Sequence, residues 1–246
     1  MRNIYDTVMN HRSIRKYKEE DIPDKYLKMI LDGAIHSPSS VNGQQCSVVV
    51  IRDPKKKAKL AEYCGDQEWI KQAPVFLVLV ADFSRVAKGI AKKNGTFDNM
   101  DSIEASLVGA VDCGIAFGTM MNLAESLGYG IVPIGAVRDE PQKVIDLLKL
   151  PKYVYPILGM CIGVPDEDPG LKPRFHFTTL IHEEEYREIT DQELDDYDDL
   201  MKGYMADKIV GEEVKDWSDM MKRVYSGIYY PRVKETMKKQ GFKNEK

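Results

Sequence analysis

The sequence lacks the features that mark several common classes of protein. It has no excess of positive charge, with 35 lysines and arginines against 39 acidic residues and a formal net charge of -4. This balance gives no global electrostatic reason to bind nucleic acid or a membrane surface. Its four cysteines and four histidines show neither a Cys-x-x-Cys pair nor metal-ligand spacing. We therefore expect reduced, mostly buried thiols, no metal site and no nucleic-acid partner.

The pattern also lacks a targeting segment and a membrane span. The amino terminus is charged from its first residues and has no apolar block followed by a cleavage site. The longest apolar stretch, 107–123, contains Asp112 and is flanked by Glu104 and Glu125, which would make insertion into a bilayer costly. We expect a buried helix there, no membrane partner and a cytoplasmic protein.

Two familiar motifs of enzymes are missing as well. No Gly-x-Ser-x-Gly elbow of a hydrolase occurs, and the glycine-rich string 128–136 does not have the Gly-x-Gly-x-x-Gly spacing of a dinucleotide-binding loop. The more useful feature of that string is Gly135, where the missing side chain would let a backbone amide approach a flat ligand closely.

Hydrophobic periodicity predicts helices and strands in alternation. The helix expected at 102–127 has apolar residues almost all round, which predicts burial on most faces and a central position. Alternation by itself favours a parallel sheet. The expected strands are 46–51, 75–81, 131–134 and 155–164, and the other expected helices are a short one ending before His11, one from Pro23, 54–63, one from Pro141 and 217–239.

The character of the chain changes after residue 165. From Asp166 onward it is more polar and contains an acid-rich patch between Asp191 and Asp199. We expect residues 1–165 to form the core and 166–246 to form an extension of the same domain that wraps the core or a partner subunit.

Three polar segments are candidates for a binding site. Two guanidinium groups, an ammonium and an imidazole occur within 11–16, and Lys172 and Arg174 lie two residues apart, so that on extended backbone they would point to one side. The segment 37–45 offers hydroxyl and amide groups just before an expected strand. Each segment also has a simpler interpretation. The segment 11–16 could be a solvated basic turn, Lys172 and Arg174 could belong to a charged loop, and 37–45 could be an ordinary turn.

Five motifs taken together carry a resemblance to a known family. They are His-Arg-Ser-Ile-Arg at 11–15, Ser-Ser-x-Asn-Gly-Gln-Gln at 39–45, Gly-Asp-Gln-x-Trp-Ile at 65–70, Pro-Ile-Gly-Ala-Val-Arg at 133–138 and Lys-Pro-Arg at 172–174. Their order and spacing resemble the flavin-reductase and NADPH-nitroreductase branch of the nitroreductase family over nearly the whole chain. The resemblance implies an α+β fold with a central, mainly antiparallel sheet between helices, and an intertwined homodimer with a carboxy-terminal extension and FMN at the subunit interface.

The resemblance also implies roles for individual residues. Lys172 and Arg174 would complete a clamp on the FMN phosphate, and the Gly135 amide would lie near N5 of the flavin. Ser39, Ser40, Asn42 and Gln45 would reach the flavin from the partner subunit. The remaining implied cofactor contacts are His11, Arg12, Ser13, Arg15, Gln67, Ile134 and Ala136.

The activity implied by the resemblance is reduction of nitroaromatics, quinones or free flavin by NADPH or NADH in a ping-pong hydride transfer. The flavin performs the chemistry, so no side chain is expected to act as a nucleophile, and the partners are small electron acceptors and a second copy of the chain. Two alternatives stay open, a flavin-storage or redox-sensing protein and another enzyme of the same fold, such as a dehalogenase.

The choice of nucleotide depends on the segment before Trp217-Ser218. In NADPH-preferring relatives a mobile loop carries an arginine that binds the 2′-phosphate, and counting back from Trp217 places Lys208 at that position. A lysine keeps the charge but loses the planar fork, and the acidic Glu212 and Glu213 would repel a phosphate. We expect NADPH to be accepted with weak discrimination over NADH, unless Lys208 is only a solvated charge.

Overall fold

The structure is a computed structural model of the chain, and it describes residues 2–206, 208 and 214–246. The chain divides into two units, of which the first comprises Met1–Pro169 and Tyr230–Lys246 and the second Gly170–Tyr229. The boundary between the two units lies close to residue 166, where the sequence becomes more polar. The last residues of the chain belong to the first unit. The two units are described separately below.

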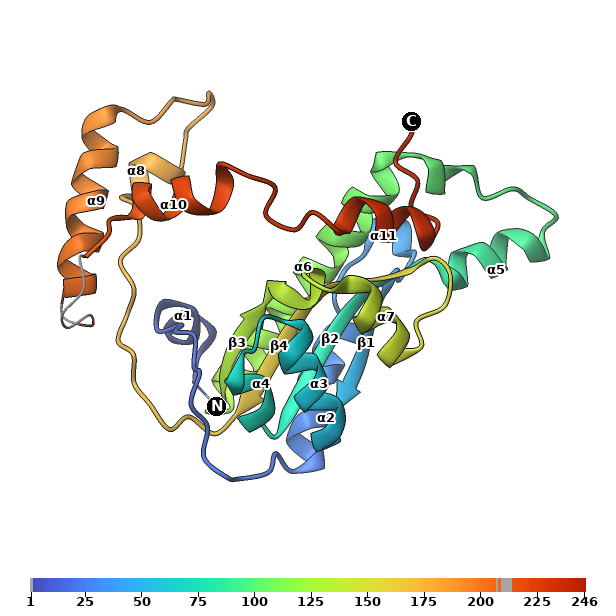
Figure 1. The fold of residues 1–246 in the computed structure, drawn as a ribbon, viewed down its shortest axis with the longest axis horizontal. Coiled ribbons are helices and arrows are strands. Elements are labelled where there is room, and N and C mark those ends of the chain that lie inside the picture. The colour runs from blue at the N-terminus through green and yellow to red at the C-terminus, as the bar shows by residue number, and fades with distance from the viewer. Residues whose placement is uncertain (1, 207, 209–213) are drawn as a thin grey trace. The chain divides into compact units, whose positions relative to one another are not determined.

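A four-stranded sheet forms the centre of the first unit (Figure 1). Its strand order is β1-β2-β4-β3, and each neighbouring pair is antiparallel. The antiparallel sheet implied by the family resemblance is therefore confirmed, whereas the parallel sheet suggested by alternation is wrong. The strands are β1 (Cys46–Ile51), β2 (Val75–Asp82), β3 (Gly130–Ile134) and β4 (Val154–Gly163).

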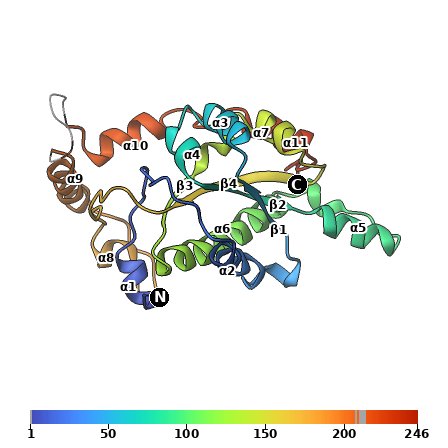
Figure 2. The same ribbon diagram turned by 90° about the horizontal axis from the view of Figure 1, so that it is seen from below.

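Helices cover both faces of this sheet (Figure 2). One face packs against α2 (Asp24–Ile35) and α6 (Ile103–Ser126), and the other against α3 (Pro54–Tyr63), α4 (Glu68–Gln72) and α7 (Pro141–Leu148).

Strand β2 shows how the two helical layers divide the core. Leu77 and Leu79 belong to the cluster around α2 and α6, whereas Phe76 and Val78 belong to the cluster around α3, α4 and α7. All eight residues of β2 are buried as a result. Burial on both faces explains the continuous Val-rich runs of the strands, a pattern that is most common in parallel sheets but here belongs to an antiparallel one.

The long helix α6 differs from its prediction. Residues on its inner side, such as Cys113 and Met120, are fully buried, but Ile103, Leu107 and Val111 are 57, 53 and 58 % exposed. Ile115, one turn further on, is 39 % exposed, so the four residues form an apolar stripe along successive turns. The expectation of burial on most faces is therefore wrong for a single chain, because periodicity does not show which chain covers a face.

Length and composition alone would also allow α6 to cross a membrane. Among the residues that the structure describes, it is the one helix that meets this test. Its packing against α2 and the sheet, however, is that of a helix in a protein core.

Local chemistry accounts for several helix boundaries. The expected helix 54–63 is confirmed as α3, which begins with Pro54 and is capped by Asp53, whose carboxylate accepts a hydrogen bond from the Lys56 amide at 2.9 Å. The first unit also contains α1 (Ile4–Met9), α5 (Ser84–Lys92) and α11 (Val233–Lys239), and short 3-10 turns at Ser40–Asn42, Asp98–Asp101 and Gly135–Arg138.

The second unit contains α8 (Phe177–Leu180), α9 (Asp191–Ala206) and α10 (Trp217–Tyr225). The acid-rich patch is thus helix α9, whose first turn carries Asp191 and Glu193, as favoured by the helix dipole. The single tail helix expected over 217–239 is wrong. It is two helices, α10 and α11, because Gly227 and Pro231 interrupt the helical pattern.

Phe242 tests whether the carboxy-terminal residues belong to the core of the first unit. Its side chain is 1 % exposed, and its ring lies edge-on to Phe83 at 5.9 Å and to Tyr155 at 6.2 Å. Phe242→Ala should lower the free energy of unfolding by about 3–5 kcal/mol, the usual cost of removing a buried phenyl ring. The control Phe177→Ala, at a position 70 % exposed, should change it by less than about 0.5 kcal/mol. Equal urea midpoints for both variants would place Phe242 outside the core.

Candidate functional site

The connector between α1 and α2 lies along the edge of the sheet at β3. Ser13 forms a parallel bridge with Ile131, and the Ile14 amide donates a hydrogen bond to the Ile131 carbonyl at 2.8 Å. Further along, Tyr17 pairs with Pro165 beyond the end of β4. Ile14 and Tyr17 are buried and anchor the segment. By contrast, His11 and Arg12 are partly exposed and Arg15 is exposed.

Carboxylates beside the connector orient its basic groups. His11 Nδ1 lies 2.7 Å from Oε1 of Glu125 at the end of α6, and the second oxygen of this nearly buried carboxylate has no hydrogen-bond partner among the described residues. Arg12 Nη1 lies 2.9 Å from Asp168 Oδ1, an exposed pair that contributes little stability. Glu167 instead accepts a hydrogen bond from the backbone amide of Arg15.

The structure brings the 11–15 motif and the 65–70 motif together. The Arg15 guanidinium carbon lies 5.6 Å from the centre of the Trp69 ring, within the range of a cation–π contact. Trp69 is in α4, and Gln67 is the residue that immediately precedes this helix. Within the described part of the chain, the Arg15 guanidinium forms no ion pair with a carboxylate. It is therefore available to an anionic ligand.

Strand β3 ends within the predicted motif at 133–138. Ile134 is its last residue and is buried, and Gly135 and Ala136 follow in a 3-10 turn and are partly exposed. A Cβ atom on Gly135 would meet only Arg138 at 3.5 Å and Tyr230 at 3.7 Å, which are ordinary contacts. The packing of the chain itself therefore does not require glycine there, in agreement with a ligand that lies close to this backbone.

The segment 39–45 lies at the opposite edge of the sheet, before β1. The Ser40 amide donates to both carboxylate oxygens of Asp112 in α6, at 3.2 and 3.3 Å. Asp112 and Glu125 are thirteen residues apart on this helix, or about 20 Å at 1.5 Å per residue. One chain thus holds the 39–45 segment and the His11–Arg15 segment well apart.

The four predicted contacts within the 39–45 segment differ in exposure. Ser40 and Asn42 are exposed and Ser39 is partly exposed, whereas Gln45 is 3 % exposed and its Oε1 atom has no partner among the described residues. A side chain on Gly43 would occupy the space of the Gln45 amide, so this loop folds over Gln45. Gln45 therefore does not face outward with the other three.

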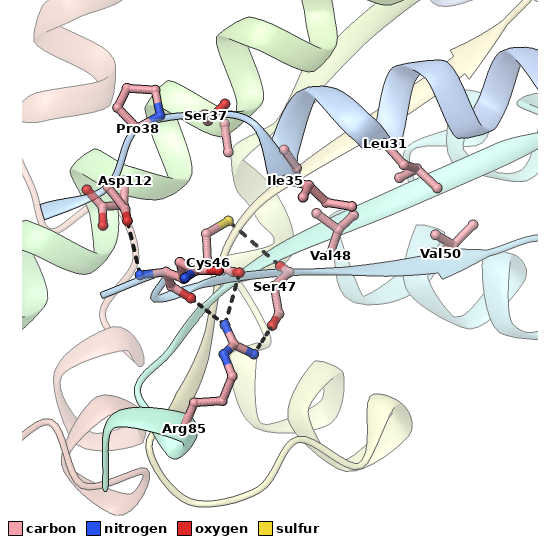
Figure 3. Close-up of a pocket in the computed structure, with 14 residues that line it drawn as sticks. Leu31, Ile35, Ser37, Pro38, Cys46, Ser47, Val48, Val50, Arg85 and Asp112 are labelled. Carbon is pink, nitrogen blue, oxygen red and sulfur yellow. Dashed lines mark hydrogen bonds between the residues drawn. The ribbon is translucent and has the colours of Figure 1, made fainter. Parts of the chain in front are cut away.

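A cavity of about 360 Å³ lies beside this segment (Figure 3). It is open to solvent and is lined by the end of α2, the first residues of β1, the middle of α6 and the start of α5. Its lining includes Ile35, Ser39, Val48, Arg85 and Asp112.

In the second unit, an aromatic cluster supports the 172–174 motif. The Phe175 and Tyr197 rings stack at 3.8 Å, and Trp217 lies edge-on to Phe175 at 5.1 Å. The Tyr197 hydroxyl donates to the Pro173 carbonyl at 3.1 Å. Lys172 and Arg174 are exposed, and Arg174 Nη1 donates to the carbonyls of Lys172 and Pro173, both at 3.2 Å.

Lys208 also belongs to the second unit. Its ammonium lies 4.4 Å from the centre of the Tyr204 ring, near the end of α9. Glu212 and Glu213, the acidic neighbours expected to weaken phosphate binding, lie outside the described residues.

The four cysteines are free thiols. Cys64, Cys113 and Cys161 are buried, and burial raises the pKa of Cys64 to about 12 and that of Cys161 well above its ordinary value. Cys46 is partly exposed at the cavity. Three of the four thiols are therefore buried, as expected from the sequence.

A sheet covered by helices on both faces, with basic and glycine motifs gathered along one edge strand, defines an α+β protein whose candidate site lies along that strand. The family model "Nitroreductase family" matches residues 8–164, and "Nitroreductase family, C-terminal domain" matches residues 172–245. The chain belongs to the nitroreductase family.

Three proteins illustrate this similarity. The chain is 42 % identical to the FMN reductase (NAD(P)H) of Bacillus subtilis over the full length of both, and 32 % identical to the oxygen-insensitive NADPH nitroreductase of Salmonella typhimurium over 96 % of this chain and 97 % of that protein. The solved structure of NfrA2 from B. megaterium is 40 % identical, covers 100 % of both chains and superposes with a TM-score of 0.96.

Sequence patterns did not identify the residues that orient the motifs. Glu125 and Asp112 each contact a motif that is more than seventy residues away in the chain, at His11 and Ser40, respectively. Trp69, which contacts Arg15, lies within the 65–70 motif that the sequence did show. No spacing pattern in the sequence could have identified Glu125 or Asp112, because only the folded chain brings them beside these motifs.

Gly135, directly after β3, and Gly159, within β4, differ in the space around them. Gly135→Ala should change the free energy of unfolding by less than about 0.5 kcal/mol, because the new methyl group meets only ordinary contacts. Gly159→Ala should lower it by about 1–3 kcal/mol, since a Cβ there would lie 2.6 Å from the Phe76 ring. Urea unfolding without added ligand measures both. A larger loss for Gly135→Ala than for Gly159→Ala would contradict this assignment.

Proposed function

We propose that this chain is an FMN-dependent NAD(P)H oxidoreductase that reduces nitroaromatics, quinones or free flavin. The observation that carries the proposal is the convergence of three motifs around β3: the basic connector, Gln67 with Trp69, and the open backbone at Gly135. The names of the B. subtilis and S. typhimurium relatives support the same activity.

The residues around β3 suit the chemical groups of FMN. Arg15 offers a guanidinium that forms no ion pair with a carboxylate among the described residues, the His11 and Gln67 side chains offer hydrogen bonds, and the Gly135 backbone leaves room for a flat ring. When bound, FMN would accept a hydride from NAD(P)H and pass two electrons to an acceptor in a ping-pong cycle. The protein's own part is to hold the ring with one face open and to place positive charge and amide donors at its edge.

The proposed site needs two chains. Ser39, Ser40 and Asn42 lie at the opposite edge of the sheet from His11 and Gly135, so in our proposal they contact the flavin of a partner subunit. The exposed stripe of α6 between these regions supports a homodimer, because monomers seldom expose several large apolar residues in one row. Lys172 and Arg174 are proposed to bind the FMN phosphate. We propose a cytoplasmic location, with small electron acceptors as the other partners.

The flavin carried by purified protein tests the proposed function. We expect yellow protein that releases FMN and not FAD on denaturation, and that is bleached by NADPH without oxygen and recoloured by menadione. A protein that binds FMN but is bleached only over hours would instead be a storage or sensing protein. Recovery of colourless protein from flavin-replete cells would contradict the proposal.

Val111 tests the proposed dimer. Val111→Asp places a charge in the middle of the exposed apolar stripe, where burial against a partner would leave it unpaired. We expect this variant to be monomeric by light scattering and to lose FMN, while its circular dichroism spectrum stays unchanged. Ala91→Asp, at another exposed apolar position on α5, serves as the control and should stay dimeric. A dimeric Val111→Asp variant would exclude this face as the interface.

Lys208 tests the proposed choice of nucleotide. If its ammonium binds the 2′-phosphate, Lys208→Ala should lower kcat/KM for NADPH by about tenfold or more, the usual effect of losing a hydrogen bond to a charged group. Because NADH has no 2′-phosphate, its kcat/KM should change by less than about twofold. Lys215→Ala, at a nearby exposed lysine, is the matched control. Equal losses with both nucleotides would reject the role of Lys208.

A further inference from the structure

The loop before β1 has an unusual backbone. Val41, Asn42 and Gln44 have φ angles of 46°, 53° and 50°, in the left-handed region that disfavours residues other than glycine, above all β-branched ones. Val41 is also 96 % exposed, so its own side chain does not hold this conformation. Such a backbone persists only where the surrounding structure holds it in place.

Two charged side chains hold the loop, one near each end. Asp112, which is 4 % exposed, accepts the Ser40 amide at the beginning of the loop. At the other end, Arg85 Nη2 donates to the carbonyls of Gln44 and Cys46, at 2.5 and 3.2 Å (Figure 3). The loop is therefore fastened to α6 at one end and to α5 at the other.

Arg85 is in turn held by a buried carboxylate. Its Nη1 atom donates to Asp82 Oδ2 at 2.7 Å and to Ser47 Oγ at 2.8 Å, and the Ser47 hydroxyl donates to the same Asp82 oxygen. Burial alone would raise the pKa of Asp82, but hydrogen bonds from Ser84 and Ser47 and the charge of Arg85 keep it below the ordinary value. Asp82 is thus ionised at neutral pH and orients the guanidinium.

The chemistry of the four acceptors requires arginine. Its planar fork donates from two nitrogens at once to a carboxylate, a hydroxyl and two carbonyls, whereas a lysine ammonium is a point donor. The hydrogen bonds of Arg85 involve no atom of Ser39, Ser40 or Asn42, and the last two residues are exposed.

We propose that Arg85 is a positioning residue for the flavin site of the partner subunit: it holds the 39–45 loop in the conformation in which Ser39, Ser40 and Asn42 meet the cofactor. This inference rests on the proposed function. Arg85 does not touch the flavin itself, and its effect passes through the loop and across the dimer.

Flavin titration of three variants tests the proposal. Arg85→Ala should raise the Kd for FMN by about tenfold, the factor that corresponds to about 1.4 kcal/mol. Arg85→Lys keeps the charge beside Asp82 but loses the fork, and should also weaken FMN. Arg52→Ala, which removes an exposed pair with Asp24 at the far end of β1, should bind FMN as the wild type does. Wild-type affinity in Arg85→Lys and Arg85→Ala would overturn the proposal.

Mixed dimers test the action across the interface. Consider a dimer of one Arg85→Lys chain and one Arg15→Ala chain. One of its sites combines the intact connector of the first chain with the intact 39–45 loop of the second. The other site combines the altered connector of the second chain with the altered loop of the first. We expect one site of wild-type affinity and one that is strongly weakened. The absence of a site of wild-type affinity would mean that Arg85 acts within its own chain and would overturn the proposal. Failure of the wild-type protein to bind FMN would instead reject the proposed function.

Discussion

The burial of both faces of the sheet is the constraint on which the rest of this structure depends. Strand β2 is buried along its whole length between α2 and α6 on one face and α3, α4 and α7 on the other. Ligand contacts can therefore be made only at the edges and ends of the strands. The polar motifs follow this constraint, since the His11–Arg15 segment pairs with β3 and the 39–45 segment leads into β1.

Helix α6 relates these two edges to each other. Glu125 near its end contacts His11, and Asp112 near its middle contacts Ser40. The same helix exposes the apolar stripe that includes Leu107 and Val111. One element thus separates the two halves of the proposed site within a chain and presents the surface through which two chains would bring them together.

The sequence predicted local features better than long-range ones. The start of α3 follows from Asp53 and Pro54, and strands β1 and β2 follow from short Val-rich runs, so both were predictable. Strand direction was not, because burial on both faces gives the same pattern in either direction. The exposed stripe of α6 was missed because an apolar residue gives the same signal whether its own chain or another covers it.

The candidate site shows the same limit. The motif residues were identifiable from the sequence. Contacts between distant segments, however, determine how the motifs are distributed over two edges of the sheet and why Gln45 is buried. The same contacts determine the roles of Asp112, Glu125 and Arg85.

Sedimentation velocity recorded at 280 and 450 nm over a dilution series tests the central claim that two chains complete one flavin site. The account predicts that the flavin signal sediments only with the dimer and that any monomer is colourless. Flavin that sediments with the monomer would contradict it.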